Sequence, residues 1–477
     1  MLAYTPASAQ SASRGPRCGF QTLKEKMIAK DPTWAAKFEA QKAAMQGIAD
    51  NYKLMQQSGV AAKTSSSRSA VPIIFHIIVD SAQFYALGGT TGITKRCDSQ
   101  IAVLNRDYNR HNPDSTSIPS SWKPLYGTPG VTFGLARIDP SGNCSPGYEV
   151  KIISGSSTTD AGYDVLSETI EDEKTASTGL AAWDNTKYYN VWCVNFTGSS
   201  NSLLGLTEPK SFGSGAYQGV DILYSTLGCT AYDGTVPSGT GSWPMPYNLG
   251  RTLTHETGHF FEIWHPWGDD GGLCPWNGGS DDGLSDTPPE SDAVYGNPTY
   301  TISGGTYNDG CQFNGATNTQ PKGIACLSYM DYTDDDAMHM FTTDEAAVIA
   351  SMVLVAPGGS GTTAGEGTVG ENYSLTQNPS LTIPCAPAAV AVVPETSADL
   401  NIFPNPTTGQ VTITLNSSAV TVKQITVINL LGQEVMTING QNKDFYSLDL
   451  SGMSKGIYFV KCNLASGDII TKKVLLQ

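Results

Sequence analysis

Apolar and polar residues follow different periods along this chain, and the periods divide it into regions. Residues 20–57, rich in Ala, Lys, Glu, Gln and Met, predict helix, with a break and a new helix start at Asp31-Pro32. Residues 58–70 form a polar stretch typical of a linker. The apolar, β-branched run at 71–79 then predicts a buried strand, and with it the start of a new domain.

Downstream of that strand, the pattern mixes helix and strand. Residues 97–110 have helical spacing, and short runs at 191–196 and 220–224 predict strands. Gly- and Thr-rich sequence from 357 to about 396 has little periodicity and predicts a linker. Beyond it, apolar residues alternate with polar ones at 411–416, and similar runs follow at 422–428 and 456–462. The expected fold class is α+β, followed by a C-terminal all-β sandwich.

Composition excludes some classes of function. The formal net charge of −16 opposes binding to a phosphate backbone, so nucleic-acid binding is excluded. No run of 18 apolar residues occurs, so no segment is expected to span a membrane as a helix. With 15% charged residues and 50 glycines among 477 residues, the composition favours an extracellular, loop-rich protein.

The cysteines point to an oxidising compartment. Ten cysteines without a C-x-x-C pair favour disulfides over a zinc ribbon. Their spacing leaves the pairing open, although Cys274, Cys311 and Cys326 lie in a Gly- and Asp-rich stretch where covalent links would help most. Residues 1–12 have small side chains like those before a signal-peptide cleavage site, but they lack its charged and apolar regions. We interpret them as a signal remnant or as a start whose export is signalled otherwise.

The segment 255–265, HETGHFFEIWH, holds three of the six histidines of the chain. Each helical residue turns about 100°, so His255 and His259 lie on one face of a helix and can share a metal. His265 falls on the far side, so the helix must end between His259 and His265. Three imidazoles leave a fourth tetrahedral position for water, and Glu256 is placed to take the proton of that water and return it to the leaving amine.

This segment resembles the metzincin pattern H-E-x-x-H-x-x-G-x-x-H with a Met-turn downstream, and within the metzincins it is most similar to the pappalysin family. The supporting sequences are GRTLT at 250–254, SDTPP at 285–289 and SYMDYTDD at 328–335. The resemblance covers roughly residues 71 to 350 and continues at Cys18. It implies a metzincin (zincin-like) catalytic domain that is a zinc metalloendopeptidase.

The resemblance also implies a role for individual residues. His255, His259 and His265 would bind zinc, and Glu256 would be the general base and acid. Met330 would form the hydrophobic floor under the metal, and Tyr332 would steady the tetrahedral oxyanion.

One position departs from the family pattern: the glycine at the end of the helix is Glu262 here. A left-handed conformation costs another L-residue about 1–2 kcal/mol, so the turn must be strained or reshaped. A rival ligand set of His255, His259 and Glu262 is conceivable, since Glu262 lies seven residues after His255 and close to it in projection. Those two positions are about 10.5 Å apart along a helix axis, which is a long reach for one zinc ion.

Acidic residues recur in the Gly-rich loops and offer the hard oxygen ligands that calcium prefers. Without the resemblance, these loops would be interpreted as solvated acidic loops. Pappalysin-like enzymes carry structural calcium near the DTP segment, which implies Asp282 and Thr287 as candidate ligands.

The substrate is expected to bind as an extra strand on an exposed sheet edge, as in proteases of this architecture. Residues 201–207, including Leu203, Leu204 and Gly205, occupy the family's edge-strand position. A pocket for a basic side chain needs a carboxylate, but the KGIAC segment supplies Lys322 and Ala325. A preference for Arg or Lys is therefore not assumed.

Both ends of the chain resemble known export and latency elements. Residues 399–477 resemble the C-terminal sorting domain of the type nine secretion pathway, through PNPTTG at 404–409, LGQEV at 431–435, KGIY at 455–458 and the terminal TKKVLLQ. The alternative is a carbohydrate-binding or adhesion sandwich. The PRCG sequence around Cys18 looks like the motif by which some metzincin prosegments place a thiolate on the zinc. A disulfide or an unpaired cysteine is the alternative for Cys18.

We therefore interpret the chain as a zymogen with a prosegment at 1–69, a catalytic domain at 70–356, a linker at 357–398 and a sorting domain at 399–477. The predicted cofactors are Zn²⁺ and Ca²⁺. The predicted partners are protein or peptide substrates and the bacterial export machinery, and the predicted location is secreted or at the cell surface. The rivals are a non-catalytic surface adhesin with a metal-stabilised fold and a zinc hydrolase acting on other substrates. An intact Glu256 argues against the adhesin, because a structural metal site needs no base.

Overall fold

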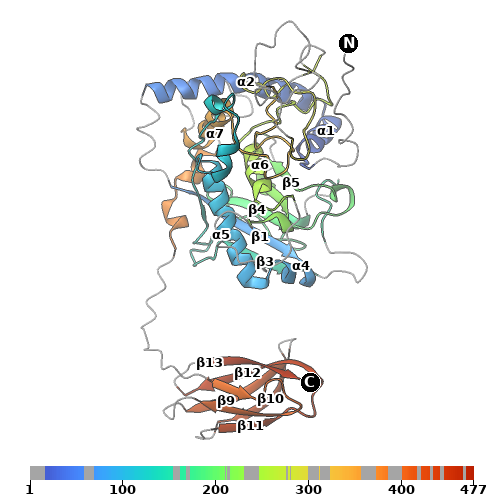
Figure 1. Ribbon diagram of the computed structural model, residues 1–477, viewed down its shortest axis with the longest axis vertical. Helices are drawn as coiled ribbons and strands as arrows, with labels where there is room; N and C mark the ends of the chain where they lie inside the picture. Colours follow the sequence, from blue (N-terminus) through green and yellow to red (C-terminus); the bar gives the residue numbers. More distant parts are fainter. Residues whose placement is uncertain are drawn as a thin grey trace. The chain divides into compact units, whose positions relative to one another are not determined.

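Figure 1 shows the computed structural model, which describes residues 17–58, 69–153, 162–167, 172–209, 211, 215–229, 246–274, 278–279, 281–298, 311, 323–355, 372–384, 400–415, 421–429, 433–440, 445–465 and 469–477. The chain divides into two compact units, Met1–Cys385 and Ala386–Gln477. Among the described residues, no helix is long and apolar enough to cross a membrane.

The N-terminal unit is built on one mixed sheet. Its strands are β1 (Val71–Val79), β2 (Phe133–Leu135), β3 (Tyr148–Ile152), β4 (Tyr189–Val194), β5 (Gly205–Glu208) and β6 (Gly219–Leu223). They run in the order β2-β1-β4-β6-β5, and β3 also pairs with β1. The ladders are parallel except that β5 pairs antiparallel with β6. Strand β5 therefore lies at an edge of the sheet (Figure 1).

Strand β1 explains the apolar run at 71–79, because all nine of its residues are buried. Its odd-numbered residues from Val71 to Val79 join the main core, whereas Ile74 and Ile78 join two other apolar clusters. Successive side chains of a strand point to opposite faces, so a strand covered on both faces needs a continuous apolar run.

Helices pack around this sheet. They are α1 (Phe20–Lys30), α2 (Thr33–Gln57), α4 (Ser81–Ala86), α5 (Gly89–Asp107), α6 (Arg251–Phe260) and α7 (Thr343–Leu354). Helix α6 contacts α5, β5 and β6, while α1 contacts β5 and α2 contacts α7. Short 3-10 helices lie at 113–117, 123–125, 172–174, 198–200, 215–217, 224–226, 373–376 and 379–382.

Of two predicted helical regions, one matches the observed helices and the other differs at both ends. The predicted break at Asp31-Pro32 is confirmed, and Asp31 accepts hydrogen bonds from the backbone N–H and the hydroxyl of Thr33. Helix α5, predicted at 97–110, instead spans 89–107. Its first turns read GTTGIT, whose glycines and threonines hide the helical period, and Arg110 at φ 58° lies in the left-handed region beyond the last turn.

Part of the stretch predicted as a linker packs against the N-terminal unit. Residues 373–376 and 379–382 form 3-10 helices, and Leu375 is fully buried in the main core. Burying apolar side chains such as Leu375 stabilises this packing, whereas the surrounding Gly- and Thr-rich sequence has little apolar surface to bury. Of the predicted linker at 357–398, the structure describes residues 372–384, and the remainder lies outside the described residues.

The C-terminal unit is the predicted antiparallel sandwich. Its strands are β7 (Leu400–Phe403), β8 (Gln410–Leu415), β9 (Val422–Asn429), β10 (Glu434–Asn439), β11 (Phe445–Asp449), β12 (Gly456–Leu464) and β13 (Ile469–Leu476). They form two sheets, β10-β9-β12-β13 and β11-β8-β7. The buried side chains of both sheets, such as Ile413 on β8 and Val460 on β12, share one apolar core.

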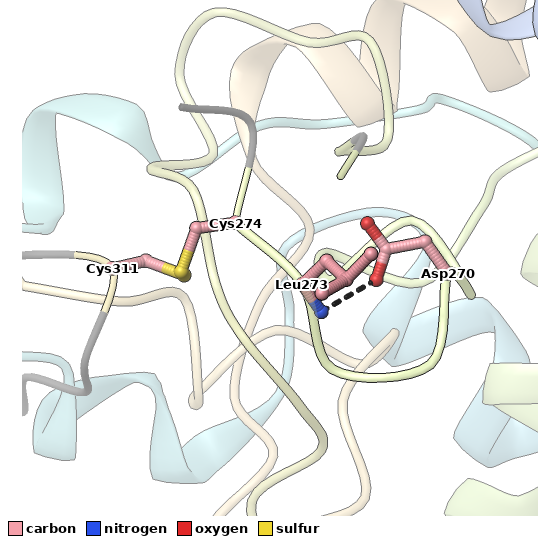
Figure 2. Close-up of a disulfide and its surroundings, with 4 residues drawn as sticks. All are labelled: Asp270, Leu273, Cys274 and Cys311. Atoms are coloured by element: carbon pink, nitrogen blue, oxygen red, sulfur yellow. Dashed lines mark hydrogen bonds between the residues drawn. A yellow bond between two sulfur atoms is a disulfide. The ribbon is translucent and has the colours of Figure 1, made fainter. Parts of the chain in front are cut away.

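A disulfide links Cys274 to Cys311 across 37 residues of the Gly- and Asp-rich stretch. Figure 2 shows it beside the turn in which the backbone N–H of Leu273 donates to the Asp270 carboxylate. This is one of the pairings that the cysteine spacing left open. Because the bond closes a long loop, it restricts the unfolded chain and stabilises the fold.

Candidate metal centre

Three histidine side chains converge at the end of helix α6. His255 and His259 lie one turn apart on the helix, which ends at Phe260. The chain then turns through Glu262, whose φ of 72° is left-handed, and His265 returns to the same point. The three Nε2 atoms lie 2.9–3.3 Å from one another. The Sγ atom of Cys18 joins them, and the four atoms all lie within 4.8 Å of one another.

The other ring nitrogen of each histidine is held by an acceptor. Nδ1 of His255 donates to the carbonyl oxygen of Tyr329 at 2.7 Å, and Nδ1 of His259 donates to that of Ile263 at 2.6 Å. Nδ1 of His265 lies 2.6 Å from Oδ1 of Asp269. Since Nδ1 carries the proton, each Nε2 keeps a lone pair directed at the common point.

Burial keeps these imidazoles neutral. It lowers the pKa of His255 to about 3, with a further contribution from the neighbouring His265. Burial also lowers the pKa of His259 and of His265 well below the usual value. Three neutral imidazoles with converging lone pairs form a donor set suited to a divalent cation such as zinc.

Glu256 lies beside this group and is almost fully buried. Its Oε2 accepts a hydrogen bond of 2.6 Å from the hydroxyl of Thr207 on β5. Burial raises the pKa of Glu256 to about 8. A carboxyl group with a pKa near neutrality can both take and return a proton.

Met330 packs against α6, and Tyr332 lies beside two of the histidines. Met330 is fully buried against α6, where a Cβ added to Gly258 would overlap its sulfur and lie 3.1 Å from its Cε. The ring of Tyr332 lies 4.9 Å from that of His265 and 5.8 Å from that of His255, between ring centroids. Its hydroxyl donates to the carbonyl oxygen of Cys18 at 3.2 Å.

Helix α6 is held at its first turn by the segment that follows Met330. Gly250, at φ 79°, provides no side-chain cap. Instead, the Asp335 carboxylate accepts from the backbone N–H of Leu249 at 2.8 Å, and the Arg251 guanidinium donates to the carbonyl oxygen of Asp335 at 2.7 Å. This reciprocal contact sets the position of the histidine-bearing helix relative to the Met330 segment.

The N-terminal segment lies along the sheet edge at the centre. The backbone N–H of Leu204 donates to the carbonyl oxygen of Arg17 at 2.6 Å, and that of Gly19 donates to Gly205 at 2.9 Å. Cys18 therefore pairs in parallel with Gly205, the first residue of β5. Leu203 and Leu204 precede the strand, which begins four residues later than the predicted 201–207 run.

Side chains of this segment and of α1 and α2 make further contacts with the centre. The Arg17 guanidinium pairs with Asp334 at 2.7 Å and lies over the rings of Tyr247 and Tyr295. The ring of Phe20 stacks on that of His259 at 4.2 Å. Two lysines contact the loop after His265: Lys24 donates to the carbonyl oxygen of Asp269 and Lys42 to that of Gly268. At the start of α7, Lys53 pairs with the Asp344 carboxylate.

The rival ligand Glu262 lies outside the group of converging atoms. Its carboxylate accepts from the hydroxyl of Ser211 at 2.6 Å and from the backbone N–H of Ser211 at 3.3 Å. The side-chain amide of Gln41 on α2 also donates to it. Because these partners come from other segments, the spacing of the motif gave no sign of them.

The two candidate calcium ligands contact each other. The hydroxyl of Thr287 lies 2.7 and 2.8 Å from the two carboxylate oxygens of Asp282, whose Oδ1 also accepts from the backbone N–H of Leu284. Burial, with the nearby Asp281, raises the pKa of Asp282 well above its usual value.

Sequence reasoning did not predict the contacts that Asp269, Thr207 and Asp335 make at the centre, although Asp269 and Asp335 belong to the acidic loops and Thr207 to the predicted edge strand. A signal existed for Asp269, because it follows His265 by four residues and a metal-binding histidine commonly donates its second ring N–H to a carboxylate. Thr207 and Asp335 act across long sequence separations, for which a single sequence offers no signal. Of the two residues named in the KGIAC segment, Ala325 is buried, while Lys322 lies outside the described residues.

Comparisons with known proteins match both units. Residues 172–354 match the family described as Pregnancy-associated plasma protein-A, and residues 401–477 match the secretion system C-terminal sorting domain. An extracellular metalloprotease of Colletotrichum graminicola is 36% identical over 275 residues, which are 58% of this chain and 72% of that protein. One of Uncinocarpus reesii is 34% identical over 34% of this chain, and the match spans about half of that relative, 48%.

Two solved structures from Tannerella forsythia share the fold. A promirolysin mutant is 26% identical with a TM-score of 0.57, and the match covers 77% of this chain and 100% of the other. Mature mirolysin in complex with a cleaved peptide is 28% identical with a TM-score of 0.50, covering 67% of this chain and 100% of the other.

Proposed function

The chain belongs to the pappalysin family of extracellular metalloproteases, and from this membership we propose that it is a secreted zinc endopeptidase made as a latent precursor. The observation that carries the proposal is the convergence of three imidazole Nε2 atoms within 3.3 Å of one another beside the buried carboxyl of Glu256. Bare nitrogen lone pairs at such distances repel each other unless a cation lies between them.

His255, His259 and His265 would hold the metal, because their Nδ1 protons are already engaged by Tyr329, Ile263 and Asp269. When bound, zinc would acidify water and polarise the substrate carbonyl. Glu256 takes a proton from the attacking water on its carboxylate and returns it to the leaving nitrogen. The Tyr332 hydroxyl donates to the developing oxyanion, and Met330 packs under the histidines.

Latency is proposed to come from Cys18. Its sulfur lies within reach of the same point as the three Nε2 atoms, so a thiolate there occupies the position that water needs. The hydroxyl of Tyr332 is bound by the Cys18 carbonyl oxygen in the same arrangement. The promirolysin relative, named as a precursor, supports a prosegment within residues 1–69 followed by the catalytic domain at 70–356.

Substrate is proposed to bind along β5, whose edge next to Leu204 and Gly205 is taken by residues 17–19 in the latent chain. Removal of the prosegment frees those backbone groups for a peptide strand. The cleaved peptide in the mature mirolysin structure supports peptides as the substrate class.

Calcium is proposed to bind at Asp282 and Thr287. A fully buried carboxylate whose pKa is raised by burial and a second acid is stabilised by a hard cation. Chelation of calcium should therefore lower the Tm of the wild-type protein, and Asp282→Asn should remove this dependence. An unchanged Tm on chelation would contradict the calcium site.

The substitution Glu256→Gln tests the proposed reaction. It should keep one zinc per chain yet lower hydrolysis of a peptide library by about 10²–10⁴-fold, because the amide cannot accept the proton. Metal analysis and turnover are measured on the activated protein. Turnover like that of the wild type would overturn the mechanism, and zinc binding without any peptide hydrolysis in the wild type would favour the adhesin alternative.

A further inference from the structure

Strand β5 faces helix α6 with two residues that both contact Glu256. Alternate residues of a strand point to the same side, so Gly205 and Thr207 point to one face and Leu206 and Glu208 to the other. Leu206 packs in an apolar cluster with Trp192 and Leu203, whereas α6 packs against β5. The face with Gly205 and Thr207 is therefore the one turned to Glu256.

Gly205 leaves the space in which the Glu256 side chain lies. A Cβ added at Gly205 would overlap Oε1 of Glu256 and lie 2.5 Å from its Cγ and 2.6 Å from its Cδ. All three of these atoms belong to Glu256. Gly205 does not have a positive φ, so its backbone accepts any residue. The glycine at position 205 is therefore needed to leave space for the Glu256 side chain, and not for the conformation of the strand.

Thr207 fixes the other carboxylate oxygen. Its hydroxyl lies 2.6 Å from Oε2 of Glu256 and 2.9 Å from the backbone carbonyl oxygen of Glu256. A hydroxyl has only one proton to donate. Oε2 is the stronger acceptor of the two oxygens, because it lies closer to the hydroxyl and belongs to a group that can carry a negative charge. Thr207 is fully buried, so water does not compete for this bond.

We propose that β5 is a positioning element for the general base: Gly205 provides the space for the Glu256 carboxyl, and the Thr207 hydroxyl holds its Oε2. The inference rests on the proposed peptidase function and deepens it. At the outer edge of the sheet, the backbone groups of Gly205 and of Leu204, the residue before the strand, pair with residues 17–19. One strand thus sets both the line along which a peptide pairs and the position of the group that takes the proton.

Thr207→Val keeps the shape of the side chain and removes the hydroxyl. In the enzyme activated by removal of its prosegment, this substitution should lower kcat about tenfold, the expected effect of losing one hydrogen bond to a charged group, with KM and zinc content unchanged. Thr207→Ser keeps the hydroxyl and should restore kcat to within about threefold of wild type. The matched control is Thr226→Val, since Thr226 is equally buried but donates to Leu223 and should leave both constants unchanged.

A double-mutant cycle on Tm tests the Gly205 contact without using activity. Gly205→Ala should lower the Tm of the full-length chain by about 2–4 °C, because the new methyl displaces the Glu256 carboxyl. In a Glu256→Ala background the same substitution should change Tm by less than about 1 °C, since the opposing atoms are gone. Equal Tm losses in both backgrounds would overturn the role of Gly205.

The outcomes separate this inference from the proposed function. If Glu256→Gln retains full hydrolysis, the function itself fails. If Glu256→Gln is inactive but Thr207→Val has the kcat of wild type, or if Thr207→Ser is as impaired as Thr207→Val, the positioning role of Thr207 is wrong while the peptidase stands.

Discussion

The two units of this chain bury different kinds of side chains. Around α6 the N-terminal unit buries ionisable groups, among them Arg251, His255, Glu256, Glu262 and Asp269. Among the described residues of the C-terminal unit, the buried polar side chains are Thr407 and Thr426, and the rest of the core is apolar. Burying ionisable groups is costly unless each has a partner, so they accumulate where chemistry needs them. A sorting module needs a stable surface and no such groups.

The sharpest test of this difference is to remove one buried side chain from each unit. His265→Ala should abolish peptide hydrolysis and weaken zinc binding by more than about a hundredfold, the upper range for losing only an outer-shell partner. Val460→Ala removes a fully buried side chain from the C-terminal core and should leave zinc content and hydrolysis unchanged. Zinc content and turnover are measured for both variants after activation. Full retention of zinc by His265→Ala would contradict the idea that the N-terminal unit buries this histidine for metal binding.

A second prediction concerns the contacts that cover the centre. Cys18→Ala should give a full-length chain that is at least about tenfold more active, or processes itself sooner, than the wild type, because the sulfur no longer occupies the place of water. Activity of freshly purified precursor is the measurement. A mutant as latent as wild type, or a Cys18 that mass spectrometry finds in a disulfide, would contradict this mechanism.

Glu262→Gly should have a smaller effect, on Tm, and tertiary contacts decide whether Tm rises or falls. The family's glycine would relieve a left-handed residue, a gain of about 1–2 kcal/mol. It would also remove hydrogen bonds from Ser211 and Gln41 to a buried carboxylate, a loss of about 1.5–3 kcal/mol for each such bond. We expect the loss to dominate, so that Tm falls while zinc content is kept. A higher Tm for Glu262→Gly would show that turn strain outweighs these bonds.

The smallest effect on catalysis is expected from the largest deletion. Removal of residues 399–477 should leave kcat and KM of the activated enzyme unchanged, since no described residue of this region belongs to the metal centre. The same deletion should abolish export from the native host, because residues 401–477 match the secretion system sorting domain. Loss of hydrolysis in the purified truncated protein would assign the tail a catalytic role.

Local patterns determined much of this protein from sequence. The i, i+4 spacing of His255 and His259 requires only one helical turn, and the continuous apolar run of β1 requires only a sheet covered on both faces. Alternation or similar short runs likewise predicted strands β8, β9 and β12 of the C-terminal unit, because each run depends on neighbours in the same short segment.

Only the tertiary structure decided which distant groups meet. Several contacts join segments that are far apart in the chain. They are the hydrogen bonds to Glu262, the hydrogen bond from Thr207 to Glu256, the cap that Asp335 provides for α6, and the packing that buries Leu375. No periodicity links such positions, because their distance depends on the path of the whole chain and not on the geometry of one element. The sequence by itself therefore determined which histidines share a turn of helix, and the tertiary structure decided how their surroundings orient them.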